Sequence, residues 1–412
     1  MAIFNKFQRT KQVAEILLRY GLDEFFERSN LEKWLPESLS NKLANESSGS
    51  VSVYERIRRA MEELGTTYVK LGQMLSDRRD LLPVEMITEL QKLQDKVEVQ
   101  PIDIAEKFQR ELGIDIHEHF EMLASEPMAS ASIGQVFKGR LKNGQDVAVK
   151  IKREGIDEVI KADLLILQDL VNFLEQRNDI ISNLQPKALL NTFKESITTE
   201  LSLESERRSI ERFANNFKQD SRILVPQTYS NLSNNNILCM DFVYGSKVTN
   251  KAQIEQQGLL AKDVALLGLD LYMKQVFEFG FFHADPHPGN ILLTPDGRIA
   301  FIDLGAMGKL SPKERELLGN CLYYASQKNV RKIIETIKQL AVSYNVPNEK
   351  TLENDLSEIF MLLTESNLAG LDGSELMNRF TKIMSENSII MPEGVYLLAK
   401  GFAQIEGIGR YL

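Results

Sequence analysis

The sequence predicts an α+β fold in which a small antiparallel sheet lies between two helical regions. Apolar residues are spaced as on one face of a helix in the first part of the chain, and short β-rich segments joined by turn residues occupy the middle. Helical spacing returns beyond Ser311. The chain has 412 residues, which is enough for two or three domains or for one large unit of two lobes.

Composition argues against several classes of protein. The chain is 43% hydrophobic and 26% charged, as ordinary globular proteins are, so global disorder is not expected. The net charge of −9 argues against a nucleic-acid partner, because such proteins present a basic field. The two cysteines, Cys239 and Cys321, both lie in apolar stretches and do not predict a disulfide scaffold or a zinc site.

No segment predicts export or a membrane span. The N-terminus lacks the apolar core and the cleavage site of a signal peptide, so we expect a cytoplasmic location. The most apolar stretch, residues 265–282, is interrupted by Asp270, Lys274 and Glu278, and we expect it to be a core helix.

Residues 1–45 are expected to be helical, with a basic start. The first twenty residues carry Lys6, Arg9, Lys11 and Arg19 against a single acid. Two interpretations stay open, because such a helix can lie on an anionic membrane surface or dock on its own domain.

A polar linker at 45–52 is followed by helical spacing over 53–121. Two β-rich segments, 133–137 and 146–151, flank the turn Lys-Asn-Gly at 142–144 and predict a hairpin. Helical patterns then return over 157–215.

The second half begins with a predicted strand over 237–243, followed by a helix over 252–282. Residues 291–302 have the pattern strand, turn, strand. Ser311 has proline at the next position and Glu314 at the third, which is the pattern of a capping box at the start of a helix.

The segment His-Ala-Asp-Pro-His-Pro-Gly-Asn at 283–290 contains the strongest candidates for chemistry. Its two prolines prevent a helix interior. Asp285 and Asn290 lie five residues apart, and the hairpin that follows turns at 295–297 and returns Asp303 beside Asn290. Two carboxylates and a carboxamide supply hard oxygen ligands for Mg²⁺ bound together with phosphates, as phosphoryl transfer requires.

Two other interpretations of this segment stay open. Asp and Asn can simply cap turns in a loop. His283 and His287 have the i, i+4 spacing of a metal-binding pair, although the prolines remove the helix that would align them.

An alanine-rich loop precedes a lysine on a predicted strand. Residues 129–136 match the kinase pattern G-x-G-x-x-G-x-V at Gly134 and Val136, with alanines in place of the first two glycines. A tight turn without a ligand is the alternative, because a Cβ restricts φ and close approach. Lys150 ends the run Val-Ala-Val-Lys, where kinases carry the lysine that contacts the α- and β-phosphates, and a solvated lysine is the alternative. Five glutamates between 195 and 211 compete as its partner, and spacing does not choose among them.

Residues 70–73 have the sequence Lys-Leu-Gly-Gln, which is similar to the K-x-G-Q signature of the UbiB/AarF (ADCK) family of atypical kinases. The alanine-rich loop, the strand ending at Lys150, the segment 283–290 and Asp-Leu-Gly at 303–305 follow in family order. The resemblance covers about residues 55–412. It implies an atypical protein-kinase-like, two-lobed α+β fold with a small antiparallel sheet in the N-lobe, a helical C-lobe and an N-terminal helical extension over the active site.

The resemblance also implies a role for each matching residue. Lys150 resembles the lysine that contacts the nucleotide phosphates, and Glu206 resembles its helical partner. Asp285 resembles the catalytic aspartate, and Asn290 and Asp303 resemble the metal ligands. ATP or ADP with Mg²⁺ is the implied cofactor.

Further positions follow from the same resemblance. Lys70 and Gln73, which share a helix face, would lie over the active site, with Lys70 near Glu200 and the phosphates. Met240 would be the gatekeeper. The implied nucleotide contacts are Ala129, Ser130, Ala131, Ser132, Ile133, Gly134, Val136, Lys150, Met240, Asp241 and Val243.

Several positions depart from the pattern. Ser202 stands where the family run E-x-D has aspartate, Leu304 replaces the phenylalanine of D-F-G, and Ala284 replaces the arginine of H-R-D. Only five residues separate Gly305 from Ser311, too few for a segment that docks a peptide substrate. In this family the Glu-Gly-Ile-Gly-Arg motif at 406–410 is followed by further sequence that often includes membrane helices, so we expect a truncated chain.

The expected function is that of an ATP-dependent kinase or ATPase acting on a small or lipid-like molecule at the inner membrane face, in quinone biosynthesis or isoprenoid lipid homeostasis. Expected partners are a nucleotide, a lipid or quinone-like molecule, the membrane surface and quinone-biosynthesis proteins. The alternatives are a protein kinase for partner enzymes and a nucleotide-gated lipid-binding scaffold. The expected domains are 1–52, 53–126 with the K-x-G-Q motif, 127–245 as the N-lobe and 246–412 as the C-lobe.

Overall fold

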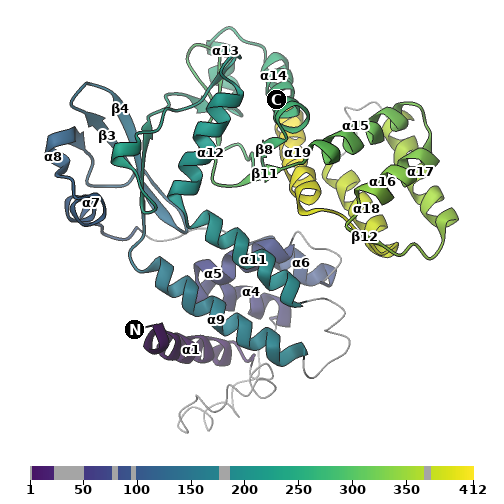
Figure 1. Ribbon diagram of the computed structural model, residues 1–412, viewed down its shortest axis with the longest axis horizontal. Coiled ribbons are helices and arrows are strands. Elements are labelled where there is room, and N and C mark those ends of the chain that lie inside the picture. The colour runs from purple at the N-terminus through teal and green to yellow at the C-terminus, as the bar shows by residue number, and fades with distance from the viewer. Residues whose placement is uncertain (1, 23–50, 77–81, 94–98, 176–185, 366–372) are drawn as a thin grey trace. The chain divides into compact units, whose positions relative to one another are not determined.

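The computed structural model describes residues 2–22, 51–76, 82–93, 99–175, 186–365 and 373–412 (Figure 1). They form two compact units. The first unit contains the chain up to residue 204 together with 230–239, and the second contains 205–229 and 240–412. The parts of the predicted N-terminal helix and linker at 23–50 lie outside the described residues.

Helices dominate the first unit. They are α1 (Ala2–Arg19), α4 (Val53–Leu64), α5 (Thr66–Ser76), α6 (Val84–Leu90), α7 (Ile104–Leu112), α8 (Ile116–His119), α9 (Ile156–Glu175) and α11 (Pro186–Glu200). An apolar cluster that includes Val13, Leu64, Tyr68, Ile160 and Phe193 joins α1, α4, α5, α9 and α11. Burial of this shared face stabilises the helices more than their own propensity does.

The basic start of the chain docks on its own unit. Lys6 pairs with Asp169 of α9 at 2.7 Å, and Arg19 pairs with Glu63 of α4. Arg9 donates to the buried Asp163. These pairs support the interpretation of α1 as a docked helix, because acids of the same unit meet its cations.

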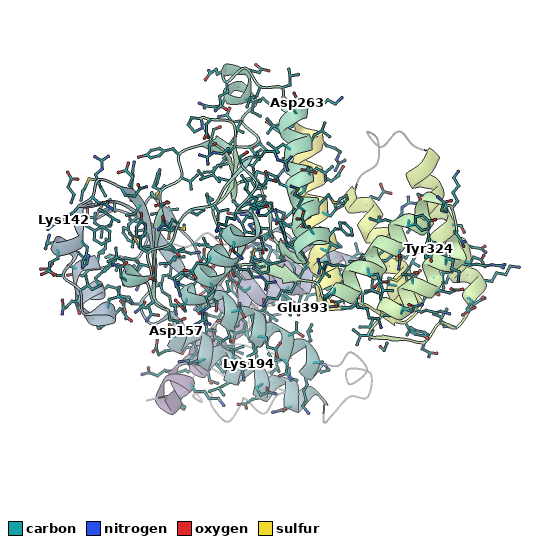
Figure 2. All side chains as sticks on the ribbon, turned by 45° about the horizontal axis from the view of Figure 1, so that its top comes forward. Lys142, Asp157, Lys194, Asp263, Tyr324 and Glu393 are labelled. Carbon is teal, nitrogen blue, oxygen red and sulfur yellow. The ribbon has the colours of Figure 1, made fainter. Side chains whose placement is uncertain are left out.

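A small antiparallel sheet lies in the first unit. Its strands are β1 (Phe120–Leu123), β2 (Ala129–Ser130), β3 (Gly134–Leu141), β4 (Asp146–Lys152) and β6 (Ile237–Asp241), in the order β1-β3-β4-β6 with β2 beside β3. The predicted hairpin is confirmed as β3–β4, with Val136 opposite Lys150. Gly144 has φ +87° at its turn, and Lys142 marks that end of the hairpin in Figure 2.

The second unit contains short strands and many helices. Its strands are β5 (Ile223–Leu224), β7 (Ser246–Lys247), β8 (Phe281–His283), β9 (Ile291–Leu293), β10 (Ile299–Phe301), β11 (Met307–Lys309), β12 (Ser343–Tyr344) and β13 (Ile389–Ile390). Its helices are α12 (Leu203–Asn216), α13 (Lys251–Gln256), α14 (Ala261–Met273), the π-helical turn η4 (Lys274–Phe279), α15 (Pro312–Ser326), α16 (Val330–Leu340), α17 (Glu349–Glu365), α18 (Gly373–Glu386) and α19 (Glu393–Tyr411). The start of α12 and most of β6 belong to the first unit. One sheet has the order β5-β10-β9-β7, and β8 pairs with β11.

The prediction of one helix over 252–282 is wrong in two places. The chain leaves the helix after Gln256, where Gly258 has φ +71°, and α14 starts only at Ala261. Gly280, with φ +58°, ends the π-helical turn, and the next three residues form β8. Both glycines adopt the left-handed conformation that ends helices, and the apolar run at 281–283 supplied no signal to separate strand from helix.

The last part of the chain is helical, as predicted, apart from the short pair β12–β13. The capping box at Ser311 is confirmed, since its side chain accepts from the N–H of Glu314 and Glu314 accepts in return. An apolar cluster that includes Ile333, Leu352, Leu356, Met384 and Val395 joins α15 to α19. Among the described residues, no helix is long and apolar enough to cross a membrane.

Candidate active site

The β9–β10 hairpin aligns two of the predicted site residues. Phe301 lies opposite Ile291, and one step further the N–H of Ile302 donates to the carbonyl of Asn290 at 3.1 Å. Gly297 closes the turn with φ +79°. Asn290 and Asp303 therefore lie at the same end of the two-stranded ribbon, as its register predicts.

The loop between β8 and β9 brings Asp285 to this end. The Asn290 Nδ2 atom donates to the Asp285 carbonyl at 3.4 Å, and the N–H of Ala284 donates to the carbonyl of Ala306 at 3.0 Å. In the second unit, Asp285, Asn290 and the segment around Asp303 thus form one group.

His283 holds the start of the loop between β8 and β9 through a hydrogen bond to its backbone. Its imidazole is buried, and its Nδ1 accepts from the N–H of Asp285 at 3.1 Å. Burial lowers the pKa of His283 to about 4, although Asp303 and Asp285 act in the opposite direction. His283 is therefore neutral at pH 7 and serves the loop as a hydrogen-bond acceptor.

The alternative of a histidine metal site gains no support from this geometry. The Nδ1 atoms of His283 and His287 both accept from backbone N–H groups, that of His287 from Gly289 at 2.9 Å. Within the described ranges no group of three or more His, Cys, Asp or Glu side chains is arranged to hold a metal.

The Asp285 carboxylate has two neighbours that the sequence did not suggest. Gln404 of α19 donates from Nε2 to Asp285 Oδ1 at 2.6 Å. Burial raises the pKa of Asp285, but the charge of Lys400 and the Gln404 hydrogen bond outweigh it, so that the pKa lies below its ordinary value. Asp285 is ionised at neutral pH.

Glu206 lies beside the Asp303–Gly305 segment. Its side chain on α12 is only 4% exposed. A Cβ on Gly305 would lie 3.8 Å from Glu206 Oε2 and 3.2 Å from Asp303 Oδ1, which also accepts from the N–H of Gly305. A glycine at 305 therefore leaves room for two acidic side chains close to the backbone.

The first unit holds the lysine and the alanine-rich loop. Ala129 lies opposite Val136, which lies opposite Lys150, so these three side chains share one face of the sheet. The loop is a tight turn in which the N–H of Ala131 donates to the carbonyl of Gly134 at 2.8 Å.

Two residues of this loop have structural contacts of their own. Ser132 and Ile133 are buried, and Ile133 belongs to the cluster that includes Tyr68. Arg153 holds the other side of the loop, because its guanidinium donates to Ser130 Oγ at 2.8 Å and to the Ala131 carbonyl at 3.1 Å.

The K-x-G-Q motif lies on α5, within the first unit. Lys70 Nζ is 2.7 Å from Glu200 Oε1, as expected from the resemblance, even though Ser202 replaces the family aspartate. The Gln73 amide donates to the Leu93 carbonyl at 3.4 Å. Gly72 allows α6 and the residues after it to approach, because a Cβ there would lie 2.3 Å from Leu93 Cδ1.

The three residues expected near adenine lie at the end of β6 and after it. Met240 is buried and forms an isolated antiparallel β-bridge with Thr228. The Asp241 carboxylate accepts a hydrogen bond from the Tyr229 hydroxyl at 2.8 Å. Val243 follows β6 outside any strand.

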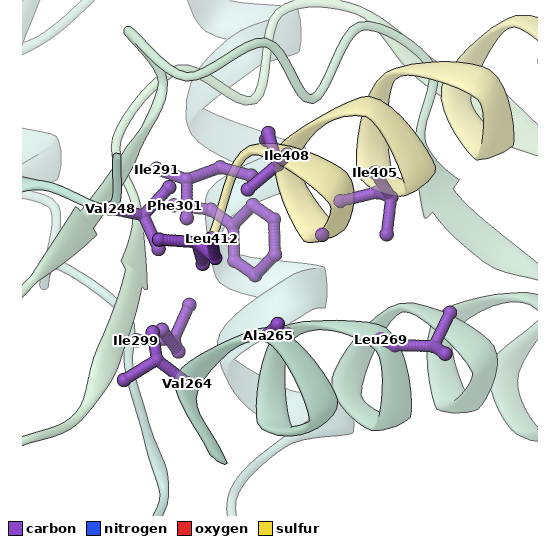
Figure 3. Close-up of a pocket in the computed structure, with 12 residues that line it drawn as sticks. Val248, Val264, Ala265, Leu269, Ile291, Ile299, Phe301, Ile405, Ile408 and Leu412 are labelled. Atoms are coloured by element: carbon purple, nitrogen blue, oxygen red, sulfur yellow. The ribbon is translucent and has the colours of Figure 1, made fainter. Parts of the chain in front are cut away.

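An apolar hollow of about 330 Å³, part of it open to solvent, lies between α14, α19 and the β9–β10 strands (Figure 3). Ile405, Ile408 and Leu412 face Val264 and other apolar residues across it. Its lining residues carry no polar side chain, so it offers no group for phosphoryl transfer.

Comparisons with known proteins agree with the expected family. A family model described as the ABC1 atypical kinase-like domain matches residues 92–337. An uncharacterized protein in the hydrogenase 1 5' region of Clostridium pasteurianum is 32% identical, over 98% of this chain and 73% of its own length. The probable protein kinase UbiB of Sodalis glossinidius is 31% identical over 100% of this chain and 76% of its own length, and that of Pseudomonas aeruginosa is 30% identical over 98% and 78%.

A solved structure shares the fold. The Rv3197–erythromycin complex from Mycobacterium tuberculosis superposes with a TM-score of 0.58 at 23% identity, over 85% of this chain and 90% of that one. The predicted α+β, two-lobed fold is confirmed. The chain belongs to the ABC1 atypical kinase-like family, together with the relatives called probable protein kinase UbiB.

Proposed function

We propose that this protein is an ATP-dependent kinase or ATPase of the UbiB type. The observation that carries the proposal is the grouping of Asp285, Asn290 and the Asp303 segment at one end of the β9–β10 ribbon. An ionised carboxylate next to two hard oxygen ligands is the arrangement that phosphoryl transfer uses.

The donor set suits magnesium. The Asn290 Nδ2 atom is directed to the Asp285 carbonyl, which turns its Oδ1 away from that contact. Asn290 and Asp303 would hold Mg²⁺, which would neutralise charge on the nucleotide phosphates. The backbone hydrogen bond from Ile302 to Asn290 fixes the spacing of these two residues.

The transfer then needs a base and an acceptor. Asp285 accepts the proton of a hydroxyl or of water while the acceptor oxygen bonds to the γ-phosphorus. The bond from that phosphorus to its bridging oxygen breaks, and ADP leaves. Because the pKa of Asp285 lies below its ordinary value, the carboxylate is ionised at neutral pH and can accept that proton.

The other residues that the family resemblance implies are assigned to the nucleotide. We assign Lys150, with Glu206 as its partner, to the phosphates. The loop 129–136 is assigned to the nucleotide, and residues 240–243 to adenine, with Met240 as the gatekeeper. Lys70 and Gln73 of α5 are assigned to the catalytic residues, with Lys70 near the phosphates, and the ion pair between Lys70 and Glu200 supports a defined place for that lysine.

The acceptor is proposed to be a small or lipid-like molecule at the inner face of the membrane, in quinone biosynthesis or isoprenoid lipid homeostasis. Only β11 and two other residues lie between Gly305 and Ser311, which leaves no long segment for docking a peptide. The relatives named probable protein kinase UbiB support the wider assignment to phosphoryl transfer.

The test is release of phosphate from ATP with Mg²⁺, with and without liposomes that contain anionic lipid. We expect Lys150→Ala and Asp303→Asn to reduce turnover by at least about 100-fold. Asp263→Asn is the control, because Asp263 is an exposed aspartate in the first turn of α14 (Figure 2).

Three outcomes discriminate the alternatives. Unchanged turnover in Lys150→Ala or Asp303→Asn contradicts the proposal. Nucleotide binding without phosphate release favours a scaffold. Labelled phosphate on a protein, abolished by Asp285→Asn, favours a protein kinase.

A further inference from the structure

The C-terminal helix α19 reaches the loop that carries Asp285. Gln404 lies 119 residues after Asp285 in the chain, yet its Nε2 donates to Asp285 Oδ1 at 2.6 Å. Lys400 lies one turn before Gln404, on the same face of α19, and its charge acts on the same carboxylate. Neither residue belongs to the motifs that identify a kinase loop.

Close packing sets the position of α19. A Cβ on Gly401 would lie 2.0 Å from the Tyr272 hydroxyl and 3.1 Å from the His283 carbonyl. The same hydroxyl donates to that carbonyl at 3.2 Å. A glycine at 401 therefore lets the helix backbone lie directly against the residue two positions before Asp285.

Apolar contacts continue along the same face of α19. Ile405 and Ile408 face α14 and the β9–β10 strands across the hollow in Figure 3. Both isoleucines are buried, so the face of α19 next to Gln404 is held within the second unit, which limits how far the amide can move relative to Asp285.

The Gln404 amide makes its hydrogen bond at a cost. Its Oε1 atom is buried and has no hydrogen-bond partner among the described residues. A buried carbonyl oxygen without a hydrogen bond is unfavourable, so an apolar side chain would suit simple packing better. The observed amide suggests a use for its donor.

We propose that Gln404 is a positioning residue for Asp285. By occupying Oδ1, its amide orients the carboxylate so that Oδ2 accepts the proton of the phosphate acceptor. Gly401 sets the distance, and Lys400 adds positive charge on the same side. This inference rests on the proposed function, in which Asp285 is the base.

The principal variant is Gln404→Leu, which removes the amide and keeps a side chain of similar size. We expect kcat for ATP turnover to fall roughly 10- to 100-fold, because the base loses its orientation, while KM for ATP stays within about twofold. Gln256→Leu is the matched control, since Gln256 is an exposed glutamine at the end of α13 in the same unit. Its kcat is expected to stay at the parent value.

A second variant tests the position of the helix without touching the amide. Gly401→Ala places a Cβ against the Tyr272 hydroxyl and is expected to push α19 away from the loop. Tyr272→Phe removes that hydroxyl, so the double variant is expected to recover a large part of the lost kcat. A purely structural role for Gly401 gives no such selective recovery at constant KM.

Hydrogen exchange supplies a readout that does not depend on turnover. Amides of 285–290 are expected to exchange faster in Gln404→Leu than in the parent and in Gln256→Leu. If the parent releases no phosphate, the proposed function fails, and this exchange measurement alone decides whether Gln404 holds the loop. A Gln404→Leu protein with parental kcat, or with parental exchange in a parent that lacks turnover, overturns the inference. If Gln404→Leu does not fold, recovery or its absence in the Gly401→Ala and Tyr272→Phe pair decides.

Discussion

A buried ion pair joins α1 to α9, and its carboxylate also binds α5, the helix that carries Lys70. The Asp163 side chain is 0% exposed and accepts from Arg9 Nε at 2.7 Å and Nη2 at 3.1 Å. Thr67, three residues before Lys70, donates to the same carboxylate at 2.6 Å. Burial raises the pKa of Asp163, although Arg9 and Thr67 act to lower it. Three helices therefore depend on one carboxylate that is costly to bury.

Removal of the cation should expose this cost. We predict that Arg9→Met lowers the free energy of unfolding by about 3 kcal/mol at pH 7, because Asp163 keeps its burial and loses its partner. Because burial raises the pKa of Asp163, the folded state favours the protonated carboxyl. The loss of unfolding free energy in Arg9→Met should therefore be smaller at pH 5 than at pH 7. Urea unfolding at both pH values measures the effect. Lys6→Met, which breaks an exposed pair with Asp169, should cost less than about 1 kcal/mol, and an equal loss in both variants would contradict the prediction.

Asp220 shows the opposite behaviour. The hydrogen bonds from Arg222, at 2.7 and 2.8 Å, hold the pKa of Asp220 well below its usual range against the effect of burial, and Lys274 adds a third at 2.7 Å. The contribution of Asp220 to stability is thus present above its unfolded-state pKa of about 4 and is lost as the pH falls through the lower folded-state pKa.

We therefore predict that Asp220→Asn lowers the melting temperature at pH 6, and that its difference from the parent shrinks as the pH falls below about 4. Melting curves at pH 6, 4 and 3 check this. Asp263→Asn serves as the exposed control. A difference that stays constant down to pH 3 would mean that the ionised form of Asp220 contributes nothing.

Residue chemistry shows why motifs predicted only part of the candidate site. The grouping of Asp285, Asn290 and Asp303 could be predicted from the sequence because a short hairpin links them, and the register of a hairpin follows from its turn. The contact of Gln404 with Asp285 could not be predicted, because nothing in the sequence of a long helix indicates which residue a glutamine on it will bind. Its contact with Asp285 depends on tertiary packing over 119 residues.

At the scale of elements, α5 depends on a glycine inside a helix. A Cβ on Gly72 would lie 2.3 Å from Leu93 Cδ1, 3.1 Å from Met61 Sδ and 3.2 Å from Leu90 Cδ2. We predict that Gly72→Ala lowers the free energy of unfolding by about 1–3 kcal/mol through overpacking, against the usual preference of helices for alanine. Chemical denaturation measures the change.

Gly319 provides the matched comparison. It lies within α15, and a Cβ there would meet no atom within 4 Å. Gly319→Ala should therefore raise stability, by up to about 1 kcal/mol, through helix propensity alone. The prediction for Gly72 is wrong if both substitutions stabilise the protein.

The elements that the sequence predicted well have local causes. The β3–β4 and β9–β10 hairpins have Gly144 and Gly297 at their turns, and α15 has its capping box. The prediction of one helix over 252–282 was wrong because apolar residues continue on both sides of Gly258 and Gly280. Periodicity does not indicate where the backbone adopts the left-handed conformation, as it does at these two glycines. Pairing of β8 with β11 then decides the strand at 281–283.

At the scale of the whole molecule, the chain does not build its units one after the other. Residues 230–239 return to the first unit after 205–229 have entered the second. The strand β6 thereby joins the sheet beside β4 although about eighty residues separate the two strands. A pattern read along the sequence gives the type of each element, whereas such a return is set by pairing between distant strands.

The proposed nucleotide site gives a prediction for the stability of the whole chain. A ligand that binds only the folded state stabilises it by roughly 3 kcal/mol at one hundred times its dissociation constant. We predict that ADP or ATP with Mg²⁺ raises the melting temperature by several degrees, and that EDTA removes most of this rise because Asn290 and Asp303 are the proposed metal ligands. Lys150→Ala should abolish the rise, since this lysine is assigned to the phosphates. Lys142→Ala should keep it, because Lys142 is an exposed lysine at the turn of the same hairpin (Figure 2). A parental rise in Lys150→Ala, or a rise that EDTA leaves unchanged, would separate nucleotide binding from these residues.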